Sequence, residues 1–359
     1  MKTSPEFSPW ITSGIAVAAV GAIAVTPIQA PLPAALSGTH VGDVQLASWA
    51  DVINTATANF EDIWDHWSPA PAPLATQALL NQAGFLQDLF TGAKTFDEVL
   101  ALIAANLTAA GDAALVPYMP AGAEDFIYTS LDTTPSTIGI DVFGFDLFDI
   151  PLPGKAALLD ILINGLHYEV GICPLCVEGT IPVLSLLVGS ETAAEIQPYL
   201  GFLGSPLSGV LWGLIGANLG PLLQLNDDLG PIIANLSGPT PDWEAALQGL
   251  LNIPENFTNA LLNGYGEVSL AELLSLFDID VPDLNTSIDF YLGGLLSPGG
   301  SLLNGLGFST ELGDCGIACA TFDVPMTAVG PLASMIGLAQ AMAEAIGWDG
   351  QAFDGLPMI

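Results

Sequence analysis

The stretch Ile196–Asn226, IQPYLGFLGSPLSGVLWGLIGANLGPLLQLN, contains no charged residue and is the most membrane-like part of the chain beyond its N-terminal segment. Pro198, Pro206 and Pro221, with several glycines between them, are expected to divide it into pieces shorter than the ~20 residues that a membrane-spanning helix needs. No Lys or Arg stands at its ends to anchor a span. We therefore favour buried core helices here, with membrane segments as the alternative.

A second uncharged run, Val324–Ala343, favours the same interpretation. Pro331 stands near its start, where proline suits the first turn of a helix because the missing N–H has no helical partner there. The helix is expected to continue through Glu344 to Trp348. At 359 residues, the chain is long enough for one large core or for two domains.

Further helices and a few strands are expected on either side of these runs. Val44–Phe60 has the spacing of an amphipathic helix, or of a strand leading into one. Pro69, Pro71 and Pro73 then predict a stiff linker.

Two more helices are predicted over Leu74–Phe90 and Thr95–Leu107, the second with Thr95 as its N-cap and acidic residues in its first turn. Alternating apolar residues over Ile138–Ile150 predict a strand or short hairpin. Ser287–Leu292 reads as another strand, and the Gly-rich turns that follow it suggest a hairpin.

The expected fold class is therefore mainly α with a few short β-strands and hairpins (α+β), and not a clear transmembrane β-barrel. Such a barrel needs at least eight strands of about ten alternating residues, and the sequence offers fewer candidates. We expect three parts: an export signal over residues 1–30, an N-terminal segment with the Pro-rich linker over 31–73, and a main apolar, acidic domain over 74–359.

The charge balance excludes most phosphate-binding functions. Lys2, Lys94 and Lys155 are the only basic residues apart from histidine, against 38 Asp and Glu, and the formal net charge is -35. Nucleic acids and nucleotides are held mainly by Arg and Lys, so we expect no nucleic-acid partner. A hydrophobic content of 51% argues against acidic disorder, and a charged content of only 11% argues against adaptation to salt. The composition suits a protein in or against an apolar phase, or a soluble protein with a large core.

The N-terminus reads as an export signal. Lys2 precedes the apolar stretch Trp10–Val25, and Ile28-Gln29-Ala30 ends in a small residue suited to cleavage. A retained membrane anchor is the alternative, although the apolar stretch is shorter than a spanning helix needs. We expect an exported protein that is either located in the cell envelope or outer membrane, or secreted.

Export determines how the four cysteines are interpreted. Cys173, Cys176, Cys315 and Cys319 form two close pairs, which in an oxidising compartment predict two disulfides. All three connectivities stay open. A zinc site is the alternative, but the spacing of the second pair and the export signal argue against it, so we expect no metal and no cofactor.

Catalytic motifs are scarce, and we expect no enzymatic activity. His40, His66 and His167 lie in unrelated surroundings, and the sequence has no nucleophile elbow, Walker-type loop or dinucleotide fingerprint. A Ser-His-Asp arrangement around His167 is the alternative to a structural histidine. Two acidic clusters, Asp227-Asp228 and Asp278/Asp280/Asp283, are more simply explained as solvated turns than as Ca²⁺ sites, and the second lacks the glycine and final glutamate of an EF-hand loop.

Several stretches resemble a family of exported proteins of mycolic-acid-containing actinobacteria that is labelled outer-membrane porin GjpA. The matching stretches lie over most of the chain: Ala47–Asp51, Leu80–Leu86, Ser205–Val210, Leu251–Pro254, Phe257–Ala260, Leu262–Gly264, Gly293–Gly300, Val329–Ala333 and Gly347–Gly350. These motifs are structural in character, so the resemblance assigns no functional residue.

The resemblance implies a porin that forms a water-filled channel for ion transport in the mycolate outer membrane. The acidic excess would make such a channel prefer small cations. A mainly helical chain with few membrane-length segments would need to form a homo-oligomer to line it. The alternative is a secreted or surface-attached envelope protein with a packed apolar core and no channel or catalytic activity. Outer-membrane lipid or the envelope surface is the expected partner in either case.

Overall fold

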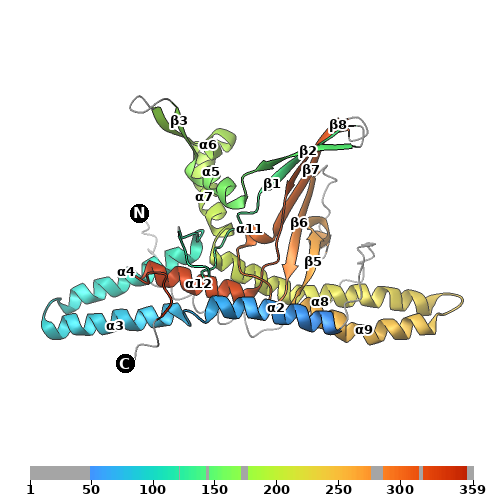
Figure 1. Cartoon of the computed structure of the whole chain (residues 1–359), viewed down its shortest axis with the longest axis horizontal. Coiled ribbons are helices and arrows are strands. Elements are labelled where there is room, and N and C mark those ends of the chain that lie inside the picture. The colour runs from blue at the N-terminus through green and yellow to red at the C-terminus, as the bar shows by residue number, and fades with distance from the viewer. Residues whose placement is uncertain are drawn as a thin grey trace, which may run out of the picture.

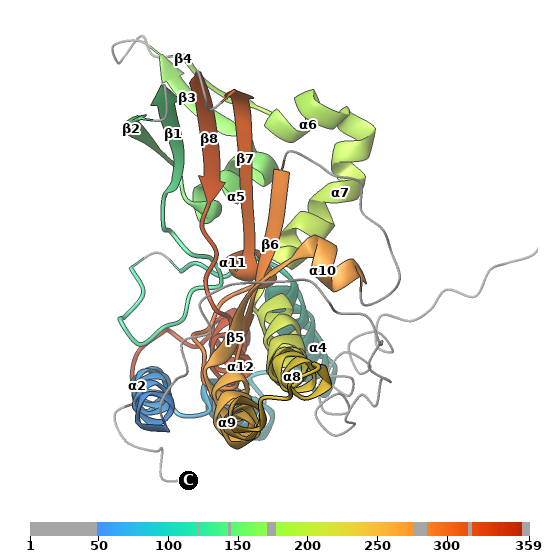
Figure 2. The same cartoon turned by 90° about the vertical axis from the view of Figure 1, so that its right-hand side faces the viewer.

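A long base of helices carries an upright antiparallel sheet near its middle (Figures 1 and 2). This computed structural model describes residues 49–120, 122–142, 145–170, 177–275, 286–314 and 318–353. Within these ranges it contains 11 helices and a six-stranded antiparallel sheet that does not close into a barrel. The expected fold class is therefore confirmed. The predicted export signal lies outside the described residues.

Two helical hairpins extend the base in opposite directions, α3–α4 to one side and α8–α9 to the other (Figure 1). Helix α12 links them because it packs against α3, α4 and α8, and α2 packs against α9 and α12. Helices α2, α3 and α9 lie along the side of the base farthest from the sheet (Figures 1 and 2). The six base helices are α2 (Trp49–Trp67), α3 (Pro73–Thr91), α4 (Phe96–Leu115), α8 (Pro206–Ser237), α9 (Trp243–Leu262) and α12 (Pro331–Ala345).

The sheet joins segments from both halves of the chain in the order β2-β1-β8-β7-β6-β5. Its central pairing is between β1 and β8, in a register that sets Ile138 opposite Phe322. The strands are β1 (Ser136–Val142), β2 (Phe145–Leu152), β5 (Gly264–Ser269), β6 (Thr286–Gly293), β7 (Leu306–Asp314) and β8 (Ala318–Val324).

The remaining elements are short and lie mostly beside the sheet. A two-stranded hairpin, β3–β4, stands at the end farthest from the base, with α5, α6 and α7 between it and the base (Figure 1). The full set of remaining elements is α5 (Lys155–Asn164), β3 (Leu166–Val170), β4 (Val177–Ile181), α6 (Val183–Val188), α7 (Ser190–Leu203), α10 (Leu270–Ser275) and α11 (Leu302–Gly305).

Helices α7 and α8 correct one sequence expectation, because Pro198 lies inside α7 and Pro221 inside α8, and neither proline divides its helix. Helix α8 runs without interruption over 32 residues, with Pro221 and Pro231 inside it. An internal proline costs about 3 kcal/mol in an isolated helix. Here α8 packs against α9, α12, β5 and β6, and this burial outweighs the local cost. Pro206 occupies the first turn of α8, where proline is tolerated.

A row of glycines lets α8 approach the backbone beneath the sheet. A Cβ at Gly213 would lie 2.5 Å from the nitrogen of Pro331, and one at Gly216 would lie 2.6 Å from the carbonyl oxygen of Gly293. Both distances are shorter than real Cβ contacts. The glycine row therefore positions α8 directly against the start of α12 and the end of β6.

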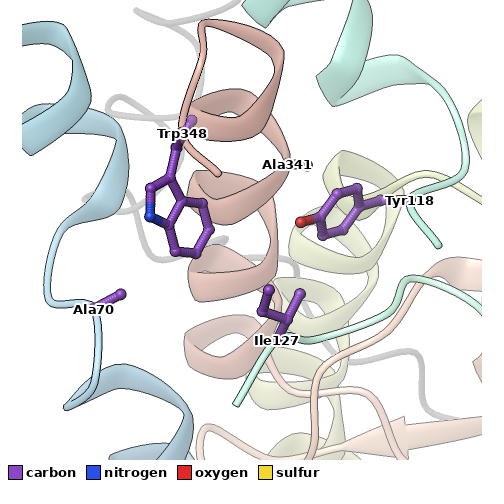
Figure 3. Close-up of a cluster of buried hydrophobic side chains, with 6 residues drawn as sticks. Ala70, Tyr118, Ile127, Ala341 and Trp348 are labelled. Carbon is purple, nitrogen blue, oxygen red and sulfur yellow. The ribbon is translucent and has the colours of Figure 1, made fainter. Parts of the chain in front are cut away.

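Two buried clusters hold the base to the sheet and to the C-terminal segment. Trp212 of α8 packs against Leu292 and Val329, and its Nε1 donates to the carbonyl of Tyr291 at 3.1 Å. In the second cluster, Trp348 and Tyr118 lie beside α12, with Ile127 below them (Figure 3). The large apolar content of the sequence thus supplies a core at the junction of base and sheet.

Several local predictions are confirmed by the element bounds. The helices expected over residues 74–90 and 95–107 are α3 and α4, and Thr95 forms a capping box with Glu98. The hairpin expected over residues 138–150 is β1–β2, and the expected strand over 287–292 is β6, which pairs with β7. The helix expected from Pro331 is α12, which ends at Ala345, three residues before the expected end at Trp348.

The region before α3 differs in detail from its predictions. The amphipathic helix expected over residues 44–60 is described from Trp49 and continues to Trp67. The Pro-rich segment forms a short turn that ends where Pro73 begins α3, instead of a longer stiff linker.

Candidate functional site

Helix α2 presents five large apolar side chains to solvent on one face. The first is Trp49 and the last is Trp67, and successive members are four, seven, four and three residues apart. In a helix with 3.6 residues per turn, these spacings place all five side chains on the same side. The Trp64 side chain is 50% exposed, and its ring centroid lies 6.4 Å from that of Phe60 and 5.3 Å from that of Trp67. We call this set the aromatic stripe of α2: Trp49, Ile53, Phe60, Trp64 and Trp67.

A neighbouring face of α2 attaches the helix to the rest of the base. Val52 and Ile63 are buried. Asn263 donates from Nδ2 to the carbonyl of Val52 at 3.1 Å, and the Tyr128 hydroxyl donates to Asp62 at 3.2 Å. Burial, with the Asp62 carboxylate nearby, raises the pKa of Tyr128, so this phenol remains a donor. Among the described residues, these contacts leave the side chains of the aromatic stripe exposed.

Three other base helices carry similar exposed rows. The most exposed side chain of the α3 row is Phe90, at 88%, and the most exposed of the α9 row is Trp243, at 70%. Together with the aromatic stripe of α2 they are called the apolar base stripes: Leu79, Leu86 and Phe90 of α3; Phe96, Leu100 and Leu107 of α4; and Trp243, Leu247, Leu250 and Leu251 of α9. Clusters of exposed apolar side chains on this scale mark a surface that contacts a partner or a lipid phase.

Two of the base helices have the length and composition of a membrane span, but they differ in burial. The apolar window of α8 is 61% buried inside the protein, which fits the core helix expected from its sequence. The window of α4 is only 17% buried. Length and hydropathy alone are weak evidence for a span, so α4 is best described as an apolar helix that the protein leaves largely uncovered.

The tryptophans divide sharply between core and surface. Trp212 and Trp348 are 7% and 4% exposed, and both indole N–H groups donate to backbone carbonyls. Trp49, Trp64, Trp67 and Trp243 are all exposed and all lie on the base. Indole rings combine a large apolar face with a polar N–H, a combination that favours boundaries between water and an apolar phase.

Basic groups are scarce beside these stripes. Within the described residues, Lys94 pairs with Asp88 at the turn between α3 and α4. Lys155 is buried and donates from Nζ to the carbonyls of Asn304 and Leu306, at 3.0 and 2.6 Å. Burial lowers the pKa of Lys155 to about 8. Neither lysine offers an unpaired charge to a ligand.

The histidines that the sequence singled out do not come together. His66 belongs to α2, where its ring stacks on Tyr128 at a centroid distance of 3.9 Å. His167 lies on β3, at the opposite end of the molecule from α2 (Figure 1), and its Nδ1 is 2.8 Å from the Thr180 hydroxyl. His40 lies outside the described residues. Over the part of the chain that is described, no group of three His, Cys, Asp or Glu residues is placed to hold a metal.

The pair Asp227-Asp228 lies within α8, so the expectation of a solvated turn was wrong for it. Tyr265 donates to Asp227 at 2.5 Å. Asn256 and Gln224 donate to Oδ1 of Asp228 at 2.9 and 3.1 Å, while its Oδ2 is buried without a hydrogen-bond partner. The pair therefore links α8 to α9 and β5. The other acidic cluster, Asp278/Asp280/Asp283, lies outside the described residues.

Of the four cysteines, the structure describes Cys319. It lies on β8, is buried, and is disulfide-bonded. Cys173, Cys176 and Cys315 lie outside the described residues, so the connectivity stays a prediction.

The apolar base stripes were not recognised from the sequence. The helical spacing of Phe60, Trp64 and Trp67 was a signal, but the same spacing fits a helix buried in a core. Comparison of the chain with protein-family models, with curated proteins and with solved structures finds no match.

Proposed function

We propose that this chain is an exported cell-envelope protein that attaches to a lipid surface through its apolar base stripes. The observation that carries the proposal is the aromatic stripe of α2, a helix with one face bound to the protein and an adjacent face of exposed aromatic rings. Amphipathic helices of this kind lie in the boundary between lipid headgroups and acyl chains.

The apolar area is sufficient for useful attachment. Complete burial of a large apolar side chain is worth about 1.5–3 kcal/mol, so burying the exposed halves of five such side chains contributes roughly 4–8 kcal/mol. Helices α3 and α9, which lie on the same side of the base as α2 (Figure 1), carry further exposed apolar side chains that would add to this. Export, expected from residues 1–30, would deliver the protein to the envelope lipids.

A channel is the second candidate, favoured by the resemblance to the porin family and by the uncovered helix α4. In this alternative, copies of α4 from several chains would cross the membrane around a cation-preferring pore. Attachment requires only the stripes that a single chain displays, so it is the simpler proposal.

Flotation of purified chain 31–359 with phosphatidylcholine vesicles tests the attachment. We expect co-flotation that Phe60→Ser/Trp64→Ser weakens by at least tenfold. A matched control is Leu186→Ser/Tyr199→Ser, because both side chains are 71% exposed but lie on α6 and α7. Absence of co-flotation, or equal loss in both variants, would refute attachment through α2. Discrete conductance steps in a planar bilayer would instead favour the channel.

A further inference from the structure

We infer that the lipid surface contacted by the base is uncharged or zwitterionic, and that an anionic lipid surface repels it at low ionic strength. This inference rests on the proposed attachment and specifies the class of lipid. It is carried by the charges that accompany the apolar base stripes.

Carboxylates adjoin the stripe residues on three helices. On α2, Glu61 follows Phe60 and Asp65 follows Trp64, each about 100° further round the helix axis, and both are exposed. On α4, Asp97 and Glu98 follow Phe96. On α9, Asp242 and Glu244 flank Trp243. A surface that covers the stripes therefore also approaches these carboxylates.

Positive charge to offset them is scarce. Of the described lysines, Lys94 is paired with Asp88 and Lys155 is buried among carbonyls. The whole chain carries a formal net charge of -35. Most peripheral amphipathic helices use Lys and Arg on their polar face to bind anionic lipid, and this base carries the opposite sign.

The expected repulsion depends on salt. Exposed charges interact over a Debye length, about 10 Å at 0.1 M ionic strength and about 3 Å at 1 M. The surface potential of an anionic leaflet acts on charges within that distance. Attachment to anionic vesicles should therefore be weak at low ionic strength and approach attachment to neutral vesicles at high ionic strength.

A second copy of the chain is the competing occupant of the stripes. Two identical bases would bring their own carboxylates together, which opposes close association at low ionic strength. A neutral lipid surface carries no such repulsion. The balance of charge thus favours neutral lipid over self-association.

Flotation with two kinds of vesicle tests the inference: phosphatidylcholine alone, and phosphatidylcholine mixed with phosphatidylglycerol, each at low and high ionic strength. We expect roughly tenfold weaker attachment to the mixed vesicles at low ionic strength, and a smaller difference at high ionic strength. At low ionic strength, Glu61→Gln/Asp65→Asn should reduce the difference in attachment between the phosphatidylcholine vesicles and the mixed vesicles. The control Glu191→Gln/Glu195→Gln has the same spacing on an exposed face of α7 and should leave this difference in attachment unchanged.

Equal or stronger attachment to the mixed vesicles at low ionic strength would overturn the inference while leaving the proposed attachment intact. Attachment to neither vesicle at either ionic strength would overturn both. In that case, sedimentation of the same samples would show whether a second copy covers the stripes.

Discussion

The side chain of Gln340 holds the backbone of Tyr128 in place from inside α12. Gln340 is completely buried, its Oε1 accepts from the Tyr128 N–H at 2.9 Å, and its Nε2 donates to the Phe126 carbonyl at 3.1 Å. Tyr128 in turn stacks on His66 and donates to Asp62, both on α2. One buried amide therefore supports the loop that attaches the aromatic stripe to the base.

Replacing Gln340 with leucine should destabilise the protein by about 2–5 kcal/mol, because it leaves a buried N–H and a buried carbonyl without partners. Urea unfolding measures the change. The control Gln82→Leu lies on an exposed position of α3 and should change the free energy of unfolding by less than about 0.5 kcal/mol. Equal effects of the two substitutions would show that the Gln340 hydrogen bonds contribute little.

Gly213→Ala should be strongly destabilising, because the new Cβ would meet the backbone of Gly330 and Pro331, which cannot rotate away. Overpacking of this kind costs about 1–3 kcal/mol or more. Gly84→Ala in α3 is the matched control, since a Cβ there meets nothing within 4 Å. It should stabilise the protein by up to about 1 kcal/mol through helix propensity. Thermal unfolding of both variants tests whether the close approach of α8 limits substitution.

Local signals in the sequence predicted much of the fold. Thr95 with Glu98 predicted the start of α4, Pro331 predicted the start of α12, and alternation predicted the β1–β2 hairpin. Each depends on residues close together in the chain. The continuity of α8 through Pro221 could not be predicted in this way, because it depends on packing against elements as distant as α12.

The candidate site was less predictable for the same reason. Trp64 and Trp212 both lie at helical spacing from other apolar residues, yet one is 50% exposed and the other 7% exposed. Glu61 and Asp65 beside Trp64 indicate an amphipathic helix, but they do not determine whether its apolar face is covered, because that depends on how elements distant in the sequence pack. The acidic excess, in contrast, was evident from composition, and it carries the inference about lipid charge.

Asp228→Asn should stabilise the protein at neutral pH. Burial raises the pKa of Asp228, and Asp227 adds to the shift, so the charged carboxylate is disfavoured in the folded state. Asparagine keeps the oxygen that accepts from Asn256 and Gln224 but carries no charge. Because the folded-state pKa exceeds the unfolded one, the native protein holds this proton more tightly. The contribution of Asp228 to the free energy of unfolding therefore becomes more favourable as pH falls through its folded-state pKa.

Urea unfolding of wild type and Asp228→Asn over a range of pH measures this linkage. The difference between them should be largest at neutral pH and should shrink as Asp228 becomes protonated in the wild type. A difference that stays constant with pH would mean that Asp228 titrates normally and that its unpartnered oxygen reaches water.

Tryptophan fluorescence should separate the base from the core when the protein meets lipid. Phosphatidylcholine brominated on its acyl chains should quench Trp64 and Trp67, whose rings lie in the aromatic stripe, and leave Trp212 unaffected because it is buried beneath the sheet. Trp64→Phe/Trp67→Phe should therefore lose the part of the quenching that these two rings contribute, while Trp49 and Trp243, which are also exposed in the apolar base stripes, retain the rest. Attachment should be retained, since phenylalanine preserves an apolar ring at each position. Trp212→Phe should leave the quenching intact. Quenching that disappears only with Trp212 would mean that lipid enters the core, and attachment through the surface of α2 would then be wrong.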